Sequence, residues 1–190
     1  TTVVLLIAMI CMQAYCQIPA ALQRPEDNGP SPADIGKFIK GFIYGAMGTD
    51  VGPLDTCIGS ATTIIKSIES IIKACEGKFD IMTIITAVGQ LFTEVPNVIK
   101  ECKQVPGSVA DKLKSWLGKL KNPITIAKIV AKAALYHAGD IKNDAQSFVS
   151  NWKGGNFEES GRSLGDIPNI LFEKCAIEED TPVVEAFLKE

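Results

Sequence analysis

His137 is the only histidine in the chain and the first residue to consider as an acid–base catalyst. It lies in the segment Leu135-Tyr136-His137-Ala138-Gly139, inside a stretch with helical periodicity. A catalytic histidine needs a nucleophile and an orienting group close in space. The pattern around His137 indicates neither, and we interpret it as a structural histidine of a helix.

Two pairs of aspartates have a spacing that acid–base chemistry could use. Asp50 and Asp55 flank a Gly-Pro pair, and Asp140 and Asp144 stand one helical turn apart. Aspartates at such positions also cap helices and carry surface charge. We interpret both pairs in that second way.

The remaining glycines and acidic residues form no ligand-binding motif. The glycines between residues 36 and 48 follow no strand and precede no Gly-Lys-Ser/Thr, which a phosphate-binding loop requires. No calcium loop of alternating Asp and Asn is present, and a single histidine without a CxxC pair argues against zinc. We therefore expect a non-enzymatic protein without a cofactor or a metal ion.

The cysteines indicate disulfide chemistry instead. Outside the first 16 residues there are four, Cys57, Cys75, Cys102 and Cys175, and four cysteines allow three pairings. Cys57 and Cys75 lie on one predicted helix and would be about 27 Å apart, beyond disulfide reach. Cys57 and Cys102 share one end of the predicted helical hairpin, whereas Cys75 lies at its turn. We predict Cys57–Cys102 and, by elimination, Cys75–Cys175.

That hairpin, residues 51–103, must position the cysteines. Its apolar residues recur at steps of three and four, the period of a helix with one wide buried face. They are Leu54, Ile58, Ala61, Ile64, Ile65, Ile68, Ile71 and Ile72, then Ile81, Ile84, Ile85, Val88, Leu91, Phe92, Val95, Val98 and Ile99. We expect the first helix to begin at Gly52-Pro53, the turn to lie at Gly77, and Pro96 to kink or break the second helix.

Further helices are predicted on both sides of the hairpin. Ser31 and Pro32 begin one whose Gly41 and Gly45 permit close approach to another helix. Ser108 is expected to cap an amphipathic helix that carries Trp116. A long helix over residues 124–152, bent near residues 139–140, and a short one that ends near Cys175 complete the series. The fold class is all-α, a disulfide-stapled bundle of about five to six helices around the central hairpin.

We divide the chain into four parts. Residues 1–16 are an apolar, signal-like segment, either cleaved or retained as a helix, and they route the chain to the secretory pathway. Residues 17–32 are a Pro-rich linker, residues 33–176 the helical domain, and residues 177–190 an acidic C-terminal tail with a short helix.

Charge is distributed unevenly, although the net charge is only −3. Eight lysines lie between residues 100 and 132, and nine acidic residues between 156 and 190. Either the two surfaces face each other in one fold, or they are complementary poles for head-to-tail assembly. A net-acidic protein with one aromatic residue, Trp116, in its basic stretch is not expected to bind nucleic acid.

Short motifs across residues 35–172 are similar to those of a broad group of small secreted helical proteins of ciliated protists. They are Phe38-Ile39-Lys40-Gly41-Phe42, the spacing of Cys57 and Cys102, Trp152-Lys153-Gly154-Gly155-Asn156-Phe157 and Leu164-Gly165-Asp166-Ile167. The resemblance implies an all-helical, disulfide-stapled secreted domain, and it implies no particular activity.

Two classes of function fit these features. The first is a secreted structural or interaction protein that assembles with itself or with other extracellular proteins. Its expected interface residues are Leu5, Leu6, Ile10, Gly41, Gly45, Trp116, Phe187 and Leu188. The alternative is a secreted carrier of a lipid or another hydrophobic ligand, which would enclose a cavity and could touch a membrane surface.

Overall fold

Helices make up most of the chain that the structure describes. This computed structural model describes residues 29–58, 62–76 and 80–175, and within these ranges it contains no strand. The elements are α2 (Pro32–Met47), α3 (Thr62–Glu76), α4 (Ile81–Ile99), α5 (Gly107–Leu120), α6 (Pro123–Tyr136), α7 (Ala138–Lys153), α8 (Phe157–Asn169) and a π-helical turn, η2 (Ile170–Lys174). The all-α prediction is confirmed.

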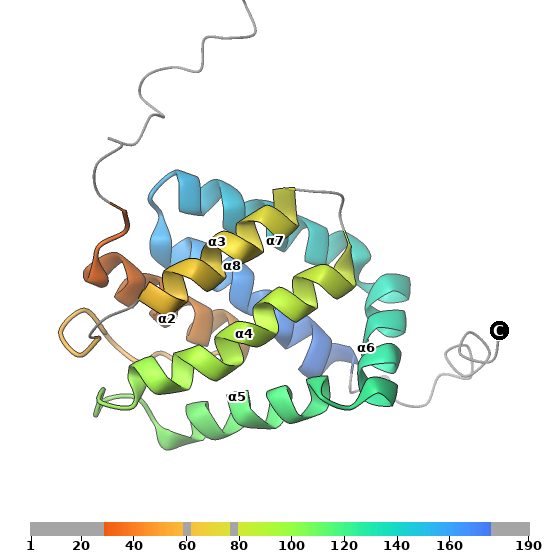
Figure 1. Ribbon diagram of the computed structural model, residues 1–190, viewed down its shortest axis with the longest axis horizontal. Helices are drawn as coiled ribbons and strands as arrows, with labels where there is room; N and C mark the ends of the chain where they lie inside the picture. Colours follow the sequence, from red (N-terminus) through yellow and green to blue (C-terminus); the bar gives the residue numbers. More distant parts are fainter. Residues whose placement is uncertain (1–28, 59–61, 77–79, 176–190) are drawn as a thin grey trace, which may run out of the picture.

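The arrangement of these helices places α2 and α8 in the middle of the fold. α3 and α4 lie across them, α5 and α7 run along opposite edges, and α6 stands at one end (Figure 1). α8 packs most extensively against α2, and also against α7. The predicted hairpin exists as α3 and α4, but it is one layer of the fold and not its centre.

Two glycines of α2 allow α8 to come into backbone contact. A Cβ atom at Gly41 would overlap the carbonyl oxygen of Glu158, and one at Gly45 would overlap that of Arg162. Only glycine leaves room for a helix backbone at this distance. The close approach expected at these glycines is therefore made with a helix of the same chain.

α8 presents the matching pair of glycines to α2. A Cβ atom at Gly161 would overlap the carbonyl oxygen of Phe38, and one at Gly165 would overlap that of Phe42. Contacts of this kind let Cα–H groups approach carbonyl oxygens across the interface. We call this reciprocal contact of Gly41, Gly45, Gly161 and Gly165 the glycine interface.

Aromatic side chains fill the space around the glycine interface. Ring contacts join α2 to α4 and α7, α4 to α5 and η2, and α7 to α8. The rings are those of Phe38, Phe42, Phe92, Trp116, Phe148, Trp152, Phe157 and Phe172. They belong to one hydrophobic core, which spans all the described helices.

The start of α2 agrees with its sequence signal. The Ser31 hydroxyl accepts a hydrogen bond from the Asp34 backbone N–H, and the Asp34 carboxylate accepts one from the Ser31 backbone N–H. This is a capping box with Pro32 at the first helical position. The predicted start at Ser31-Pro32 is confirmed.

The start of the hairpin was predicted wrongly. Residues 51–58 form a turn-containing loop, and the described part of α3 begins at Thr62. Val51, Leu54 and Ile58 are nevertheless buried in the core. The loop thus buries three residues at a spacing that a helix would also bury.

Three other helix boundaries also differ from the prediction. α4 continues through Pro96 to Ile99 without a break. Ser108 is not the cap of α5, because Pro106 occupies that position and makes no side-chain capping bond. The long helix is divided at His137, where φ is −131° and ψ is 13°, so α6 and α7 are separate helices.

α4 is the one helix of the described ranges that is long and apolar enough to cross a membrane. Its Ile84, Val88 and Leu91 are buried in the hydrophobic core. A core helix of a soluble protein passes the same test of length and composition. We therefore describe α4 as a core helix.

Candidate interaction surface

His137 lies at the junction of α6 and α7. Its backbone N–H donates to the carbonyl oxygen of Ala133, and its Nδ1 lies 3.4 Å from an Asp140 carboxylate oxygen. The Asp140 side chain is exposed, so this pair is a solvated contact at the first turn of α7. The geometry supports the interpretation of His137 as a structural residue.

The other candidate carboxylates lie in two places: Asp50 in a turn, and Asp144 where α7 meets α8. Asp50 accepts a hydrogen bond of 3.0 Å from the Gly52 backbone N–H, where Gly52 has a φ of +67°. On α7, burial and the nearby carboxylates of Asp166 and Asp140 raise the pKa of Asp144 to about 6, against the opposing charge of Lys174. Asp144 is thus a proton-binding group where α7 meets α8.

The Asp166 carboxyl lies on α8, and its pKa is raised as well. Burial raises its pKa, while Lys174 and Arg162 oppose the change. Two carboxyl groups that share one helix interface hold protons more readily than exposed ones do. This pair was not predicted, because sequence spacing does not show which residues of α7 and α8 face each other.

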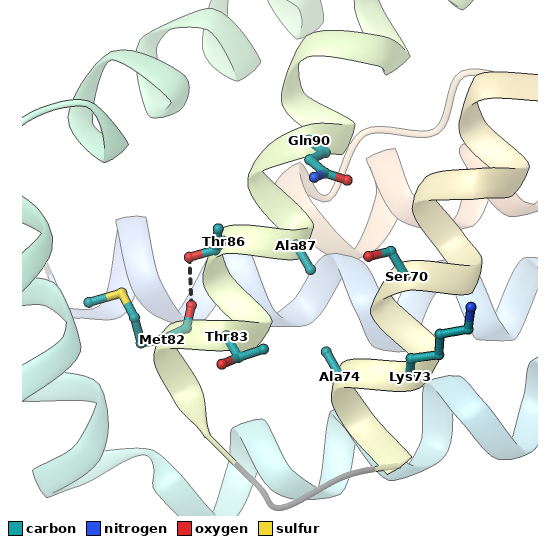
Figure 2. Close-up of a pocket in the computed structure, with 8 residues that line it drawn as sticks. All are labelled: Ser70, Lys73, Ala74, Met82, Thr83, Thr86, Ala87 and Gln90. Atoms are coloured by element: carbon teal, nitrogen blue, oxygen red, sulfur yellow. Dashed lines mark hydrogen bonds between the residues drawn. The ribbon is translucent and has the colours of Figure 1, made fainter.

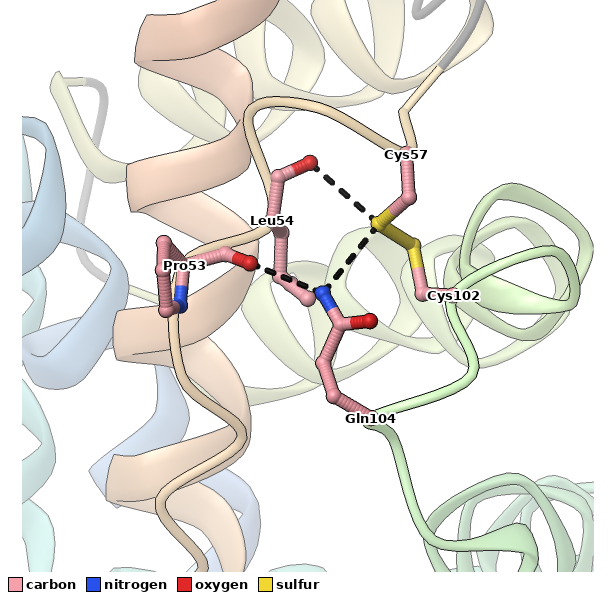
Figure 3. The surroundings of a disulfide bond; sticks show 5 residues. All are labelled: Pro53, Leu54, Cys57, Cys102 and Gln104. Carbon is pink, nitrogen blue, oxygen red and sulfur yellow. Dashed lines mark hydrogen bonds between the residues drawn. A yellow bond between two sulfur atoms is a disulfide. The ribbon is translucent and has the colours of Figure 1, made fainter.

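Cys57 and Cys102 form a disulfide, the pair that the hairpin argument predicts. Their Cα atoms lie 5.2 Å apart, and the bond ties the loop before α3 to the chain after α4 (Figure 3). Gln104 Nε2 donates a hydrogen bond of 2.8 Å to the Pro53 carbonyl oxygen beside it. This bond holds the same loop a second time.

The predicted Cys75–Cys175 disulfide is absent. Cys75 lies near the end of α3, which packs against α4 and α7. Cys175 follows η2, which packs against α6 and α8, and the Cys175 carbonyl oxygen accepts a hydrogen bond from Lys132. The elimination argument failed because it assumed that the two remaining cysteines pair with each other.

Three of the expected interface residues are buried inside the domain. Gly41 and Gly45 lie in the glycine interface, and Trp116 is only 2% exposed. Trp116 stacks on Phe172 of η2 with ring centroids 5.1 Å apart. These residues therefore contribute to packing and not to an outer surface. The others, Leu5, Leu6, Ile10, Phe187 and Leu188, lie outside the described residues.

α6 instead carries several of the large apolar side chains that are exposed in the described ranges. Ile124 is 68% exposed, Leu135 45% and Tyr136 44%. Ile124 and Leu135 are eleven residues apart, about three helical turns, so they lie on the same side of α6. We call Ile124, Leu135 and Tyr136, with the exposed Ala127 and Lys128 between them, the α6 face. These residues were not predicted to form a surface.

A second surface feature is a groove between α3 and α4. It has a volume of about 470 Å³ and is open to solvent. Ala74, Met82 and Ala87 form its apolar part, and Lys73 lies at its rim (Figure 2). The Thr86 hydroxyl beside it already donates to the Met82 carbonyl oxygen.

Together the helices, the aromatic core and the disulfide define a small all-helical domain with a single described cross-link. Residues 17–173 match the family described as SctB-like, secreted protein B-like. Because this match covers most of the 190 residues, the chain belongs to the SctB-like family. The comparisons with curated proteins and with solved structures found no match.

The family description agrees with secretion, the coarse localisation expected from residues 1–16. The route of secretion and the resemblance to proteins of ciliated protists stay predictions. The boundaries of the four parts of the chain stay predictions as well.

Proposed function

We propose that this protein is a secreted, non-catalytic interaction protein that assembles with further copies of itself through the α6 face. One observation carries the proposal: Ile124, Leu135 and Tyr136 of α6 are exposed, whereas other apolar residues of this helix, such as Ile129, pack against the core. Exposed apolar patches of this kind mark interaction sites.

Charge complementarity supports a second copy as the partner. Lys128 is exposed on α6, and this helix contains no acidic residue. A surface that binds it should therefore be both apolar and acidic. Residues 156–190 of this chain carry nine acidic residues, so another copy offers the required charge. Such a contact joins two different surfaces and produces head-to-tail assembly.

The alternative, a carrier of a lipid or hydrophobic ligand, draws no support from the fold or the family. The isoleucines expected to line a cavity, among them Ile64, Ile68 and Ile84, are fully buried in the hydrophobic core. Closely packed side chains leave no room for a ligand at these positions. We therefore do not propose ligand transport.

The mass of the purified protein in solution, measured across a wide range of concentration, tests the proposal. We expect a mass that rises with concentration in the unmodified chain, and a monomer when Ile124→Asp and Leu135→Asp are combined. Met82→Asp is the matched control, because Met82 is an exposed apolar residue on α4 with 38% exposure. A chain that is monomeric throughout would overturn the proposal, and so would an equal effect of Met82→Asp.

A further inference from the structure

The described fold ends directly beside α6. Lys132 of α6 is only 8% exposed, and its Nζ donates a hydrogen bond of 3.0 Å to the Cys175 carbonyl oxygen. A lysine at this point satisfies a carbonyl group at the end of the final helical turns. Cys175, the last described residue, is therefore fixed to α6.

We infer that residues 176–190 of the same chain fold back over the α6 face and cover it. The inference rests on the proposed function and concerns the regulation of that same surface. A covered face is withheld from other copies, and its release makes it available. The C-terminal segment is then an intramolecular competitor of assembly.

The sequence of this segment complements the α6 face in hydrophobicity. Thr181-Pro182 is a helix-start signal, and Val183, Val184, Phe187 and Leu188 follow at spacings that place them along one stripe. A stripe of this kind fits an apolar helical surface such as Ile124 and Leu135 provide.

The charges are complementary as well. Residues 176–190 carry five acidic residues and one lysine. The α6 helix carries no acidic residue, and of its two lysines Lys132 is buried and Lys128 is exposed. Lys128 is exposed within the α6 face, where an acidic segment lying along the helix would meet it.

The length of the segment suffices for this contact. The six residues before Pro182 span up to about 20 Å when extended. α6 is 14 residues long, which corresponds to about 21 Å. Because the segment starts at α6, its local concentration at the α6 face reaches the millimolar range. The segment therefore competes well against a second copy in dilute solution.

Cross-linking in the full chain tests whether residues 176–190 cover the α6 face. A photoreactive phenylalanine analogue replaces Phe187, and the cross-linked peptides are identified by mass spectrometry. We expect a cross-link within one chain to the peptide that contains residues 123–136. Cross-links to other helices only, or between chains only, would overturn the inference.

Amide hydrogen exchange provides a second, independent readout. In the full chain that combines Phe187→Ser with Leu188→Ser, we expect exchange in residues 123–136 to rise at least about tenfold, because the covering apolar side chains are lost. Ala186→Ser is the matched control, since Ala186 lies off the apolar stripe, and it should leave exchange unchanged. Equal exchange in the double variant and the control would overturn the inference.

The outcomes separate this inference from the proposed function. If exchange in α6 rises but the chain stays monomeric, the cover is supported and self-assembly is not. If the unmodified chain assembles through Ile124 and Leu135 while exchange does not respond to Phe187 and Leu188, self-assembly is supported and the cover is overturned.

Discussion

Single glycines decide how closely the two middle helices approach. At Gly161 a side chain would meet the carbonyl oxygen of Phe38, which belongs to a helix backbone and cannot move aside alone. At a surface glycine such as Gly118, an added Cβ atom would come within 4 Å of no neighbouring group. The same substitution should therefore have opposite effects at the two positions.

We expect Gly161→Ala to lower the free energy of unfolding by about 1–3 kcal/mol, because α2 and α8 must separate to admit the methyl group. Gly118→Ala in the exposed part of α5 should raise it by about 0.5–1 kcal/mol, since alanine favours the helix. Urea denaturation of both variants measures the difference. Equal stability of the two variants would contradict the glycine interface.

A second prediction at the residue scale concerns pH. Because the pKa of Asp144 is raised to about 6 in the folded protein, the folded state binds a proton that the unfolded state has already released. Stability should therefore fall as the pH rises from about 4 to about 6, and level off above this range.

Asp144→Asn should weaken this dependence, of which Asp166 retains a part, and raise the free energy of unfolding at pH 7 by about 1 kcal/mol, a value reduced for partial solvent exposure. Thermal denaturation between pH 4 and pH 7 measures both effects. The exposed Asp111 on α5 offers the control, since Asp111→Asn should preserve the pH dependence. An unchanged pH profile in Asp144→Asn would show that another group is responsible.

At the scale of single elements, α6 has few buried residues and is hydrogen-bonded near both of its ends. Asn122 caps its first turn by accepting hydrogen bonds of 3.0 and 3.1 Å from the backbone N–H groups of Ile124 and Thr125. Near the other end, Lys132 is bonded to the Cys175 carbonyl oxygen. Only Ala131, Lys132 and Ala133 of this helix are buried.

We expect Asn122→Ala to cost about 1 kcal/mol and to accelerate amide exchange in α6 before it affects α2 or α8. Ser108→Ala is the control, because Ser108 lies near the start of α5 but does not cap it. Hydrogen exchange measured by mass spectrometry follows each helix separately. A uniform rise in exchange across all helices would argue against an independently weak α6.

The same elements show what the sequence reveals and what it hides. The three- and four-residue period placed α4 correctly, since its buried side chains are those of one helical face. It failed at Leu54 and Ile58, because a loop can bury apolar residues at helical spacing. The α2–α8 contact could have been anticipated from the repeated spacing of four between Gly41 and Gly45 and between Gly161 and Gly165.

The surface was harder to predict than the core. Apolar residues of α6 have the same pattern whether they face the core or the solvent, so periodicity does not separate the two cases. The proton-binding pair of Asp144 and Asp166 depends on which faces of α7 and α8 meet. Long-range packing of this kind is absent from local sequence patterns.

For the molecule as a whole, the disulfide restricts the unfolded chain. It joins residues 45 positions apart, which corresponds to about 4 kcal/mol in the chain-entropy description. We expect Cys57→Ser with Cys102→Ser to lower the free energy of unfolding by about 2–4 kcal/mol. Chemical denaturation measures this loss, and Cys75→Ser is the control because Cys75 forms no disulfide. A double variant as stable as the control would contradict the assigned role.

The glycine interface also has a consequence for the order in which the protein can be made. α2 is among the earliest helices to be synthesised, but the groups that fill its glycine face belong to α8, near residue 161. During translation the inner face of α2 therefore lacks its partner helix until almost the whole domain has been produced. The newly made chain cannot complete its core step by step, and its folding is postponed until the last helix arrives.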